Sequence, residues 1–466
     1  MEKTNKRPSH SINMLEGPLL GKILLFTLPI IGSNILQTLF NTVDMIVVGR
    51  FEGDLALGAV GTCSGLTALI LALVMGLSLG AGVCVSVALG ARQGKDVSRF
   101  VHTGMTVALL AGLLVAAIGF FGAPVFLSWM NIDGELLSMA SRYMRIYFLG
   151  APAITVYNFG FAIMRSQGDT RRPLVYILIA GIANAGFNLL FVAVFGLGVV
   201  GVALGTLISF VISASLVVAS LFRYRDDCRL TLKGLGISRS HFLEILRVGI
   251  PSGIRGALFG ISNTMLQAAT NSLGDVATAG NAAASSIESF LYIAVSGFAA
   301  ASSAFVGQNY GAGNYRRIRR VTLLCTSLSI AAGILVGYSF IFLRAPLVGL
   351  YLPEGSPAIE IAYERILTVF SFYLFEGFFE TLGGALQGIK VMIKPTASTI
   401  LMICGFRLAW IFFVFPLEPF HSLGGLYLCY PLSWALNTAV HLLLVWYSYP
   451  RICPKEKDVQ NAAAAA

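Results

Sequence analysis

Long apolar segments alternate with short polar stretches along the whole chain. The apolar segments lie near residues 19–49, 59–89, 100–128, 138–165, 173–195, 198–222, 246–273, 276–306, 321–350, 359–388, 396–417 and 422–449. A helix needs about 20 such residues to cross a bilayer. A membrane β-barrel would show alternating segments of about ten residues instead. The pattern therefore predicts an all-α integral membrane protein with about twelve transmembrane helices.

The composition agrees with a chain that lies mostly in lipid. Hydrophobic residues make up 56% of the 466 positions and charged residues only 12%, which is about half the charged fraction of a typical soluble protein. Inside a bilayer every backbone polar group must be paired within the structure, and a helix achieves this alone. These numbers argue against a soluble globular protein.

Basic residues are concentrated in every second polar stretch. They are Lys3, Lys6, Arg7 and Lys22; Arg92, Lys95 and Arg99; Arg165, Arg171 and Arg172; Arg223, Arg225, Arg229, Lys233 and Arg239; Arg316, Arg317, Arg319 and Arg320; Lys390 and Lys394; Arg451, Lys455 and Lys457. Because cytoplasmic loops carry the excess of Lys and Arg, we expect a multi-pass protein of the bacterial inner membrane with both termini in the cytoplasm. The net charge of +10 follows from this topology, so we expect no nucleic-acid partner.

The second half of the chain repeats landmarks of the first. Pro29 and Pro251 both stand early in an apolar segment, about 220 residues apart. Gln167-Gly168 and Gln387-Gly388 close corresponding segments at nearly the same offset. We infer two pseudo-symmetric six-helix bundles. An even number of spans per unit makes the repeats parallel, related by an axis along the membrane normal.

These landmarks divide the chain into five parts. They are a cytoplasmic N-terminal segment (1–18), an N-terminal six-helix bundle (19–222), a cytoplasmic linker (223–245), a C-terminal six-helix bundle (246–450) and a cytoplasmic tail (451–466). The first 17 residues show no short apolar core, so no signal peptide is predicted. The alanine run 462–466 is interpreted as a cloning remnant.

Cysteine and histidine give no sign of catalysis. The seven cysteines are scattered without a CxxC pair, and the five histidines do not cluster. This usage argues against a disulfide framework and against a zinc site. We therefore expect neither an enzyme nor a bound cofactor, and no metal site beyond a coupling ion.

Several ionisable residues fall inside apolar segments, where a charge costs at least about 3 kcal/mol and is functional by default. They are Asp44, Arg255, Glu288, Glu376, Glu380 and Arg407. Asp44 has only Arg50 as a basic neighbour in its own segment. A partner on another helix neutralises this acid, or it carries a proton for part of the time. The alternative interpretations are a packing hydrogen bond and an aspartate that stays wet near the membrane surface.

Glu376 and Glu380 stand one helical turn apart and share a face. Two like charges so close need compensation in apolar surroundings. Arg255, Arg407, a bound cation or a shared proton are the possible sources. Coupling and a purely structural ion-pair network therefore both remain open for this group. By contrast, residues near span ends are predicted to reach the interface by snorkelling: Arg142, Arg145, Arg344, Glu364 and Arg365.

Uncharged features stand beside these acids. Asn184, Asn188 and Thr206 offer oxygens that suit either a cation site or hydrogen bonds between helices. Pro29 lies about four turns before Asp44 and is either a hinge or a static kink. Four aromatic residues are weaker candidates for lining a cavity: Tyr157, Phe159, Phe161 and Tyr373.

Taken together, these motifs resemble the MATE (multidrug and toxic compound extrusion) transporters. The stretch from Leu36 to Asp44 with Val48-Gly49 is similar to the family's first-span motif. Further similarity lies at 88–91, 165–173, 249–251 and 307–313, so the resemblance covers nearly the whole chain. The run 286–290 is similar to the MepA-like bacterial branch.

The resemblance implies two six-helix bundles facing a central cleft and export of organic cations driven by inward H⁺ or Na⁺. It places the family's coupling acid on Asp44, the bending proline on Pro29, the span-five pair on Asn184 and Asn188, and the span-six threonine on Thr206. The second member of that pair is usually Asp, so one negative charge is missing here. An acid used in another branch matches Glu376, whereas the span-seven acid of that branch falls on Phe259. We therefore favour H⁺ over Na⁺.

The function predicted from the sequence is secondary active multidrug efflux by alternating access. Asp44, Asn184, Asn188 and Thr206 are the predicted coupling-ion residues, with Na⁺ at Asp44 as an option. Substrate or coupling residues in the C-terminal half are predicted to be Glu288, Glu376, Glu380, Arg255 and Arg407. The expected partners are small organic cations or drugs and membrane lipid, and the chain is expected to act as a monomer. Alternatives are a lipid-linked sugar flippase, which would need an Arg-rich cavity, and, less favoured, a membrane-embedded enzyme.

Overall fold

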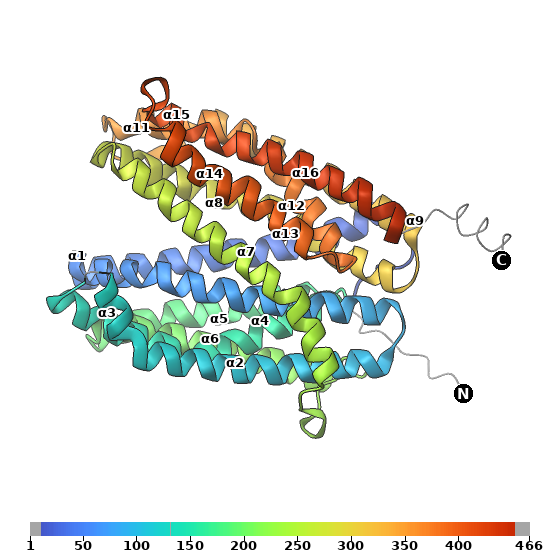
Figure 1. Cartoon of the computed structure of the whole chain (residues 1–466). Helices are drawn as coiled ribbons and strands as arrows, with labels where there is room; N and C mark the ends of the chain where they lie inside the picture. Colours follow the sequence, from blue (N-terminus) through green and yellow to red (C-terminus); the bar gives the residue numbers. More distant parts are fainter. Residues whose placement is uncertain (1–10, 131, 453–466) are drawn as a thin grey trace, which may run out of the picture. The chain divides into compact units, whose positions relative to one another are not determined.

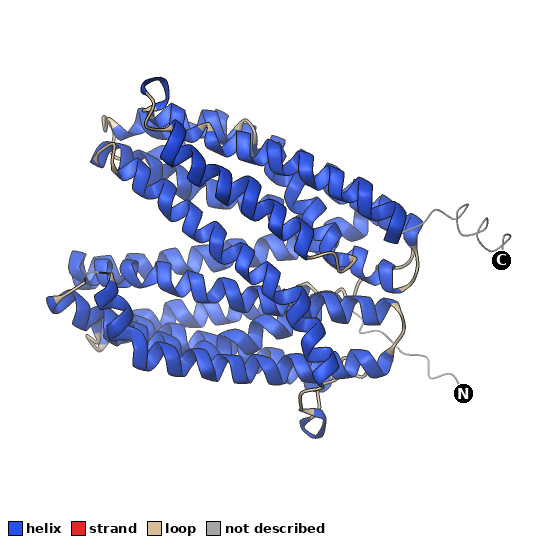
Figure 2. Ribbon diagram, viewed as in Figure 1, coloured by secondary structure: helices blue, strands red, loops and turns tan. Residues whose placement is uncertain are grey.

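The computed structural model describes residues 11–130 and 132–452, and the described part is almost entirely helical with no strand (Figure 2). The predicted N-terminal segment is therefore described only from Ser11 onward. The basic residues Lys3, Lys6 and Arg7 lie outside the described residues. The predicted tail is described only to Ile452, and the alanine run interpreted as a cloning remnant also lies outside them.

The described residues form sixteen α-helices, most of which are labelled in Figure 1. Short π-helical and 3₁₀ segments join some of them. In the first half they are α1 (Leu19–Gly90), α2 (Gly94–Trp129), α3 (Gly134–Leu149), α4 (Ala151–Ser166), α5 (Arg171–Leu189) and α6 (Gly198–Arg223). In the second half they are α7 (Arg239–Asn271), α8 (Asp275–Gly311), α9 (Tyr315–Phe342), α10 (Arg344–Gly349), α11 (Ala358–Arg365), α12 (Tyr373–Gly388), α13 (Ile393–Thr399), α14 (Phe406–Ala409), α15 (Leu423–Tyr427) and α16 (Cys429–Ile452). The π-helical segments are Leu190–Val194, Ile366–Phe370, Ile400–Gly405 and Trp410–Val414, and the 3₁₀ segments are Leu232–Gly234 and Glu418–Phe420.

The first two predicted spans are two helices that follow one another within α1 without a loop and meet at a kink. Within α1, Gly53 alone leaves the helical conformation, with φ 79° and ψ −172°. Glycine adopts such a positive φ at no steric cost. The chain therefore turns at a single residue, inside the polar stretch that the sequence placed between the two spans.

Nine helices in the described part of the chain are long and apolar enough to cross a membrane. Two bent pairs raise this number to eleven: α3 with α4, bent by 46°, and the Ala358–Phe370 helix with α12, bent by 48°. These pairs are the predicted fourth and tenth spans, which occupy equivalent places in the two halves. The remaining predicted span, the seventh, coincides with α7, which is 33 residues long and is not among the apolar set. The all-α membrane architecture is thus confirmed.

The chain divides into two compact units. One consists of Met1–Asn13 and Gly32–Ile254, and the other of Met14–Ile31 and Arg255–Ala466. One boundary lies between Asn13 and Met14, before α1. The other two fall inside α1 and α7, each within one turn after a proline, Pro29 and Pro251. The two halves therefore divide at equivalent positions, as expected for a duplicated unit.

Close helix contacts in the N-terminal unit depend on glycines. A Cβ atom at Gly181 on α5 would lie 1.7 Å from Cε2 of Phe40 on α1. A Cβ atom at Gly205 on α6 would lie 2.1 Å from Oδ1 of Asn188 on α5. Small residues let membrane helices approach closely, where dispersion and interhelical hydrogen bonds replace the hydrophobic effect. These two glycines bring α1, α5 and α6 together around Asp44.

Glycines also allow close helix contacts around α12 in the C-terminal unit. A Cβ atom at Gly384 would lie 2.4 Å from the carbonyl oxygen of Ala299 on α8, and one at Gly377 would lie 3.0 Å from that of Ser329 on α9. Helix α12 also packs against α16. A buried apolar cluster that includes Phe379 and Trp434 fills the space between these helices. Helix α12 and its glutamates are thus held at the centre of this unit.

The segment between α6 and α7 is shorter than the predicted linker 223–245, because α7 begins at Arg239. It is also attached to the N-terminal unit. The backbone N–H of Thr231 donates to Nε2 of His102 at 3.0 Å. The side chain of Gln167 donates to Asp226 at 3.0 Å. Burial raises the pKa of the Asp226 carboxyl above its usual value, although hydrogen bonds from Cys228 and Gln167 oppose the shift.

Candidate functional site

The four predicted coupling residues of the N-terminal unit lie together. The amide Nδ2 of Asn188 on α5 donates to Oδ1 of Asp44 on α1. The hydroxyl of Thr206 on α6 donates to Oδ2 of the same carboxylate at 3.5 Å. Asn184, one turn before Asn188, donates to the Thr206 hydroxyl at 3.4 Å. Residues from three helices therefore converge on a single acid.

Asp44 has no ion-pair partner within 4 Å among the residues that the structure describes; the groups that bond to it are an amide and a hydroxyl. The Oδ1 atoms of Asn184 and Asn188 are buried and have no hydrogen-bond partner within the described part of the chain. Carboxylate, amide and hydroxyl oxygens are the ligands that hard cations prefer. A proton on Asp44 would also remove its charge. The arrangement can therefore accept either a proton or a small cation.

The cavity beside Asp44 is small, at about 70 Å³. Gln37, Asn41, Tyr157 and Phe210 are among the residues that line it. A water molecule occupies about 30 Å³ of liquid, whereas drug-sized ligands need cavities of about 300–1,000 Å³. This cavity has room for an ion with one or two waters and no room for a drug.

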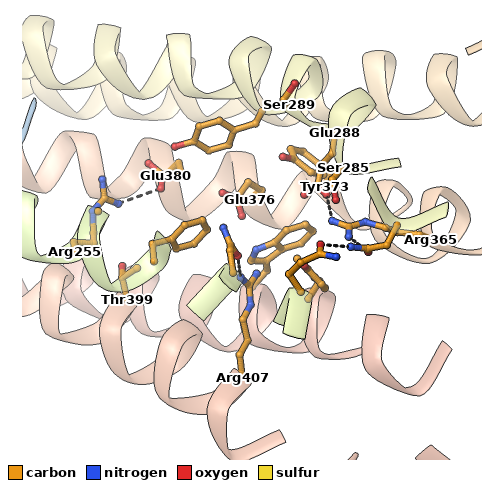
Figure 3. Close-up of a pocket in the computed structure, with 18 residues that line it drawn as sticks. Arg255, Ser285, Glu288, Ser289, Arg365, Tyr373, Glu376, Glu380, Thr399 and Arg407 are labelled. Atoms are coloured by element: carbon orange, nitrogen blue, oxygen red, sulfur yellow. Dashed lines mark hydrogen bonds and ion pairs between the residues drawn. The ribbon is translucent and has the colours of Figure 1, made fainter. Parts of the chain in front are cut away.

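A much larger cavity of about 510 Å³ lies in the C-terminal unit (Figure 3). Its lining contains three arginines and three glutamates, which are Arg255, Arg365, Arg407, Glu288, Glu376 and Glu380. All five residues predicted for this half therefore lie in one cavity. Phe259, Tyr292, Tyr373 and Trp434 are among its aromatic lining residues. A cavity of this size that combines aromatic walls with a few charges is typical of a small-molecule site.

Two of the glutamates are neutralised by arginines within the cavity (Figure 3). Nη1 of Arg255 lies 3.1 Å from Oε1 of Glu380. Nη2 of Arg365 lies 2.5 Å from Oε2 of Glu288, and the same guanidinium donates to Asn281. Among the described residues, Glu380 forms an ion pair with an arginine within 4 Å and Glu376 does not, so the two members of the predicted acid pair differ.

The prediction that Arg365 snorkels to the interface is wrong. Only 4% of this residue is exposed. Its guanidinium lies 5.6 Å from the ring centre of Tyr427 and 5.2 Å from that of Tyr430. Position near a span end could not reveal this, because the partners Asn281 and Glu288 belong to a different helix. The sequence signal was Glu288, which needed a cationic partner somewhere.

The other four residues that we predicted to snorkel have side chains that are exposed or half-buried, as snorkelling requires. Arg142, Arg145 and Glu364 are exposed. Arg344 is half-buried, with its guanidinium 5.3 Å from the ring centre of Tyr363. None of the four lines the large cavity.

Arg407 and Glu376 are the most deeply buried basic and acidic side chains of the cavity, with exposures of 0% and 2%. Nη1 of Arg407 donates to Oδ1 of Asn263 at 3.0 Å. The guanidinium lies 4.4 Å from the ring centre of Tyr430 and 5.4 Å from that of Phe259. Among the residues that the structure describes, its Nη2 atom has no hydrogen-bond partner, and neither has Oε2 of Glu376. Arg407 therefore has a buried donor, and Glu376 a buried acceptor, whose hydrogen-bonding capacity is unused within the described chain.

The aromatic candidates divide between cavities and core. Tyr157 lines the small cavity and Tyr373 the large one. Phe159 and Phe161 line neither and are buried in the core. Pro29 lies inside α1 without interrupting the helix. No group of three or more His, Cys, Asp or Glu side chains suited to a metal ion occurs in the described parts of the chain.

Sequence reasoning missed the amides of the large cavity. Asn263 on α7 and Asn281 on α8 bind Arg407 and Arg365, respectively. Both stand inside apolar segments, which is the signal that could have identified them, since polar side chains in membrane helices often pair with one another.

One protein-family model matches the chain, and it does so in two places. A family model described as MatE matches residues 29–190 and 251–413. One match falls in each half of the chain, at equivalent positions. This agrees with the duplication inferred from the prolines and the glutamine-glycine pairs.

Curated relatives match over most of their length. The probable multidrug resistance protein YoeA of Bacillus subtilis is 25% identical over 444 residues, which cover 93% of this chain and 94% of that protein. The probable multidrug resistance protein NorM of Thermotoga maritima is 26% identical over 394 residues (83% and 84%). The multidrug export protein MepA of Staphylococcus aureus is 25% identical over 385 residues (80% and 82%).

Solved structures share the fold. One is described as an outward-facing conformation of a multidrug resistance MATE family transporter of the MOP superfamily; its TM-score is 0.86 at 23% identity, covering 96% of this chain and 98% of that one. A transporter of the MOP superfamily from Pyrococcus furiosus gives the same TM-score, identity and coverage. Its description states that the reverse polarity of its binding pocket suggests a different function.

Proposed function

The chain belongs to the MatE family, and from this premise we propose that it is a secondary active transporter that exports organic cations or drugs in exchange for H⁺ or Na⁺. Relatives named as multidrug resistance and export proteins support a drug substrate. They also support a non-enzymatic role. We propose that the protein lies in the bacterial inner membrane with both termini in the cytoplasm, on the strength of the alternating basic stretches. We also propose that it acts as a monomer.

The observation that carries this proposal is the neutral surroundings of Asp44. An ionised carboxylate inside a membrane bundle is costly unless it is paired. Asn188 and Thr206 bond to it but bring no positive charge. A proton or a small cation from the medium therefore has a binding site there, with the Oδ1 atoms of Asn184 and Asn188 as further ligands.

The two cavities differ in size, and each suits a different ligand, the coupling ion or the drug. The coupling ion fits the cavity of about 70 Å³ beside Asp44, and the drug fits the cavity of about 510 Å³ in the C-terminal unit. Each ligand can shift a conformational equilibrium only by the difference between its affinities for the two states. We propose that loading and unloading of Asp44 supplies that difference for alternating access, with bending at Pro29 as the motion.

The lipid-linked sugar flippase is the second candidate, and the arginines of the large cavity favour it more than the sequence indicated. Arg255, Arg365 and Arg407 all line that cavity. Two of them are neutralised by Glu380 and Glu288. Three glutamates line the cavity beside the three arginines, so it lacks the excess of arginines over acids that a pyrophosphate-linked sugar would favour. We therefore retain drug export as the proposed function.

Transport in proteoliposomes tests the proposal. The full chain would be reconstituted, and a pH gradient or a Na⁺ gradient imposed separately, with a panel of fluorescent organic cations as substrates. We expect at least one cation to move uphill with one of the two gradients and to stop when an ionophore collapses that gradient. If neither gradient moves any cation, while a lipid-linked sugar is flipped, the proposal is wrong and the second candidate is right.

A further inference from the structure

We propose that the outer surface of the C-terminal unit binds one anionic phospholipid between the start of α13 and the end of α16. Its phosphate contacts Lys394 and Arg451, and its acyl chains lie along exposed apolar side chains of both helices. This inference goes beyond transport and rests only on the placement of the chain in a membrane. The observation behind it is a pair of cations that share one tyrosine ring.

The ring of Tyr447 on α16 carries two cations. The guanidinium carbon of Arg451 lies 3.5 Å from its centre, and Nζ of Lys394 on α13 lies 4.5 Å from it. Neither cation has an ion-pair partner within 4 Å in the described parts of the chain. The stretches 381–417 and 419–452, which contain both helices, have no acidic residue. Because like charges held close to one ring repel each other, a shared anion would stabilise the arrangement.

Hydrogen bonds on the buried side of the two helices fix this arrangement. The hydroxyl of Ser398 on α13 donates to Oδ1 of Asn437 on α16 at 2.8 Å. The hydroxyls of Tyr449 on α16 and Thr322 on α9 lie 2.6 Å apart. Helices α13 and α16 therefore keep a constant relation, and the side chains on their opposite faces point outward together (Figure 1).

The cations and their ring are open to a ligand. The side chains of Lys394 and Arg451 are exposed, and 43% of Tyr447 is accessible. Tyrosine and tryptophan are common at the level of the lipid headgroups, and Trp446 beside this ring is 76% exposed. A phosphate group at this level could reach both cations at once.

Exposed apolar side chains continue from this point along both helices. On α16 they recur at helical spacing on one face, which comprises Leu432, Leu436, Ala439, Leu442, Leu443 and Trp446. On α13 and the π-helical segment after it they are Ile393, Ala397 and Leu401. Leu443 stands one turn before Tyr447, so the apolar face leads directly to the cations. Acyl chains attached to the bound phosphate would lie against these side chains.

The combination favours an anionic phospholipid over other occupants. A zwitterionic headgroup brings its own cation next to Lys394 and Arg451 and gains little there. A soluble anion gains nothing from the apolar face. Each Lys or Arg near the membrane surface strengthens binding of an anionic lipid about fivefold, so two cations on one ring suffice to distinguish a single lipid from its neighbours.

Quenching of Trp446 by brominated lipids tests the inference. The full chain would be reconstituted in phosphatidylcholine vesicles that contain a rising fraction of phosphatidylglycerol with brominated acyl chains, or of phosphatidylcholine brominated in the same way. Bromine quenches indole fluorescence only at contact, and the difference between the wild type and Trp446→Phe isolates the signal of this residue. We expect the anionic lipid to bind beside Trp446 about 20-fold more tightly than the zwitterionic one.

Matched variants identify the groups responsible. Lys394→Gln combined with Arg451→Gln should abolish the preference, and each change alone should lower it about fivefold. Tyr447→Phe keeps the ring and should keep the preference, whereas Tyr447→Leu removes the ring that holds both cations and should reduce it. Lys95→Gln combined with Arg99→Gln removes two exposed cations of the N-terminal unit and should leave the preference unchanged.

Four results would overturn the inference. They are a wild type without a preference for the anionic lipid, a preference that survives the loss of both cations, an equal loss in the control pair, and a preference that excess inorganic phosphate abolishes. The third would assign the effect to overall surface charge, and the fourth would assign the site to a soluble anion. Unchanged quenching by brominated phosphatidylcholine shows that a variant is folded. The proposed export function is tested separately, because this measurement uses neither a gradient nor a transported substrate.

Discussion

Asp44 and the glutamates of the C-terminal unit are buried carboxylates with different kinds of partner. Glu288 and Glu380 are each matched by an arginine, which fixes their charge. Asp44 is surrounded by an amide and a hydroxyl, which can bond to the carboxylate whether or not it carries a proton or a cation. Asp44 can therefore gain and lose a proton or a cation without breaking an ion pair, which makes it the better candidate for coupling.

The position of Asn188 depends on the absence of a side chain at Gly205. A methyl group there would lie 2.1 Å from Oδ1 of Asn188, so Gly205→Ala must displace the amide that bonds to Asp44. We expect export driven by an ion gradient to fall about tenfold or more, with expression near normal. The measurement is gradient-driven dye uptake by everted vesicles.

Gly186→Ala is the matched control for that experiment. Gly186 lies on α5 between Asn184 and Asn188 but is exposed, and a Cβ atom there would meet nothing within 4 Å. Replacing a helical glycine by alanine is favourable by up to about 1 kcal/mol. We expect normal transport from this variant. Equal loss in both variants would mean that α5 and α6 tolerate no change in general, and the specific role of the Asn188 amide would be refuted.

Breaking the buried pair of Arg365 and Glu288 should reduce stability. Removing one partner of a buried ion pair leaves an uncompensated charge and costs about 3–5 kcal/mol. We therefore expect Arg365→Gln to lower the melting temperature of the purified protein by several degrees. Arg344→Gln, which removes a half-buried cation with no ion pair within 4 Å in the described chain, serves as control. A melting temperature equal to that of the control would contradict the assigned energy of the pair.

At the scale of residues, the sequence identified the buried ionisable side chains better than it identified the groups that bind them. A charge inside an apolar segment is conspicuous, so Asp44, Glu288 and Glu376 could all be found. Which helix supplies each partner depends on packing, and no pattern along the chain contains it. Arg365 was misassigned for this reason, and Asn263 was missed.

At the scale of elements, the sequence predicted where helices lie but not how they bend. The breaks between α3 and α4 and before α12 lie inside single apolar segments. Gly150 and Pro152 mark the first break in the sequence, whereas the second is preceded by a π-helical turn at Ile366–Phe370. Such turns arise where side-chain packing displaces a backbone hydrogen bond, so single-residue propensities do not reveal them.

The segment between α6 and α7 makes a prediction about pH. Burial raises the pKa of Asp226, so the folded state retains a proton that the unfolded chain releases near pH 4. Stability therefore falls as the pH rises from about 4 through the raised folded value, and the loss persists above it. Asp226→Asn keeps an oxygen for Gln167 and removes this loss.

Thermal unfolding between pH 4 and pH 7 provides the measurement for that variant. We expect Asp226→Asn to unfold at a higher temperature than the wild type at pH 7, with the difference shrinking toward pH 4. Glu354→Gln, at an exposed position, controls for the loss of one carboxylate. A variant that is less stable than the wild type at pH 7 would show that the hydrogen bonds of Asp226 outweigh the cost of its burial.

At the scale of the whole molecule, the two units share a scaffold and differ in charge. Both contain a bent span at the same place, and each matches the MatE family model once. The N-terminal unit places one acid among neutral oxygens beside a small cavity, and the C-terminal unit places three acids and three arginines around a large one. Duplication could be predicted from spaced landmarks. The separate uses of the two halves required the cavities, which no spacing reveals.

The central claim, that Asp44 couples ion flow to export, is tested most directly by Asp44→Asn in proteoliposomes. Passive exchange of a fluorescent cation at equal ion concentrations would be compared with uphill transport under the driving gradient. We expect the variant to retain dye binding and to lose uphill transport, because asparagine can neither release a proton nor supply a charge for a cation. Wild-type accumulation of dye against its gradient by Asp44→Asn would contradict the claim.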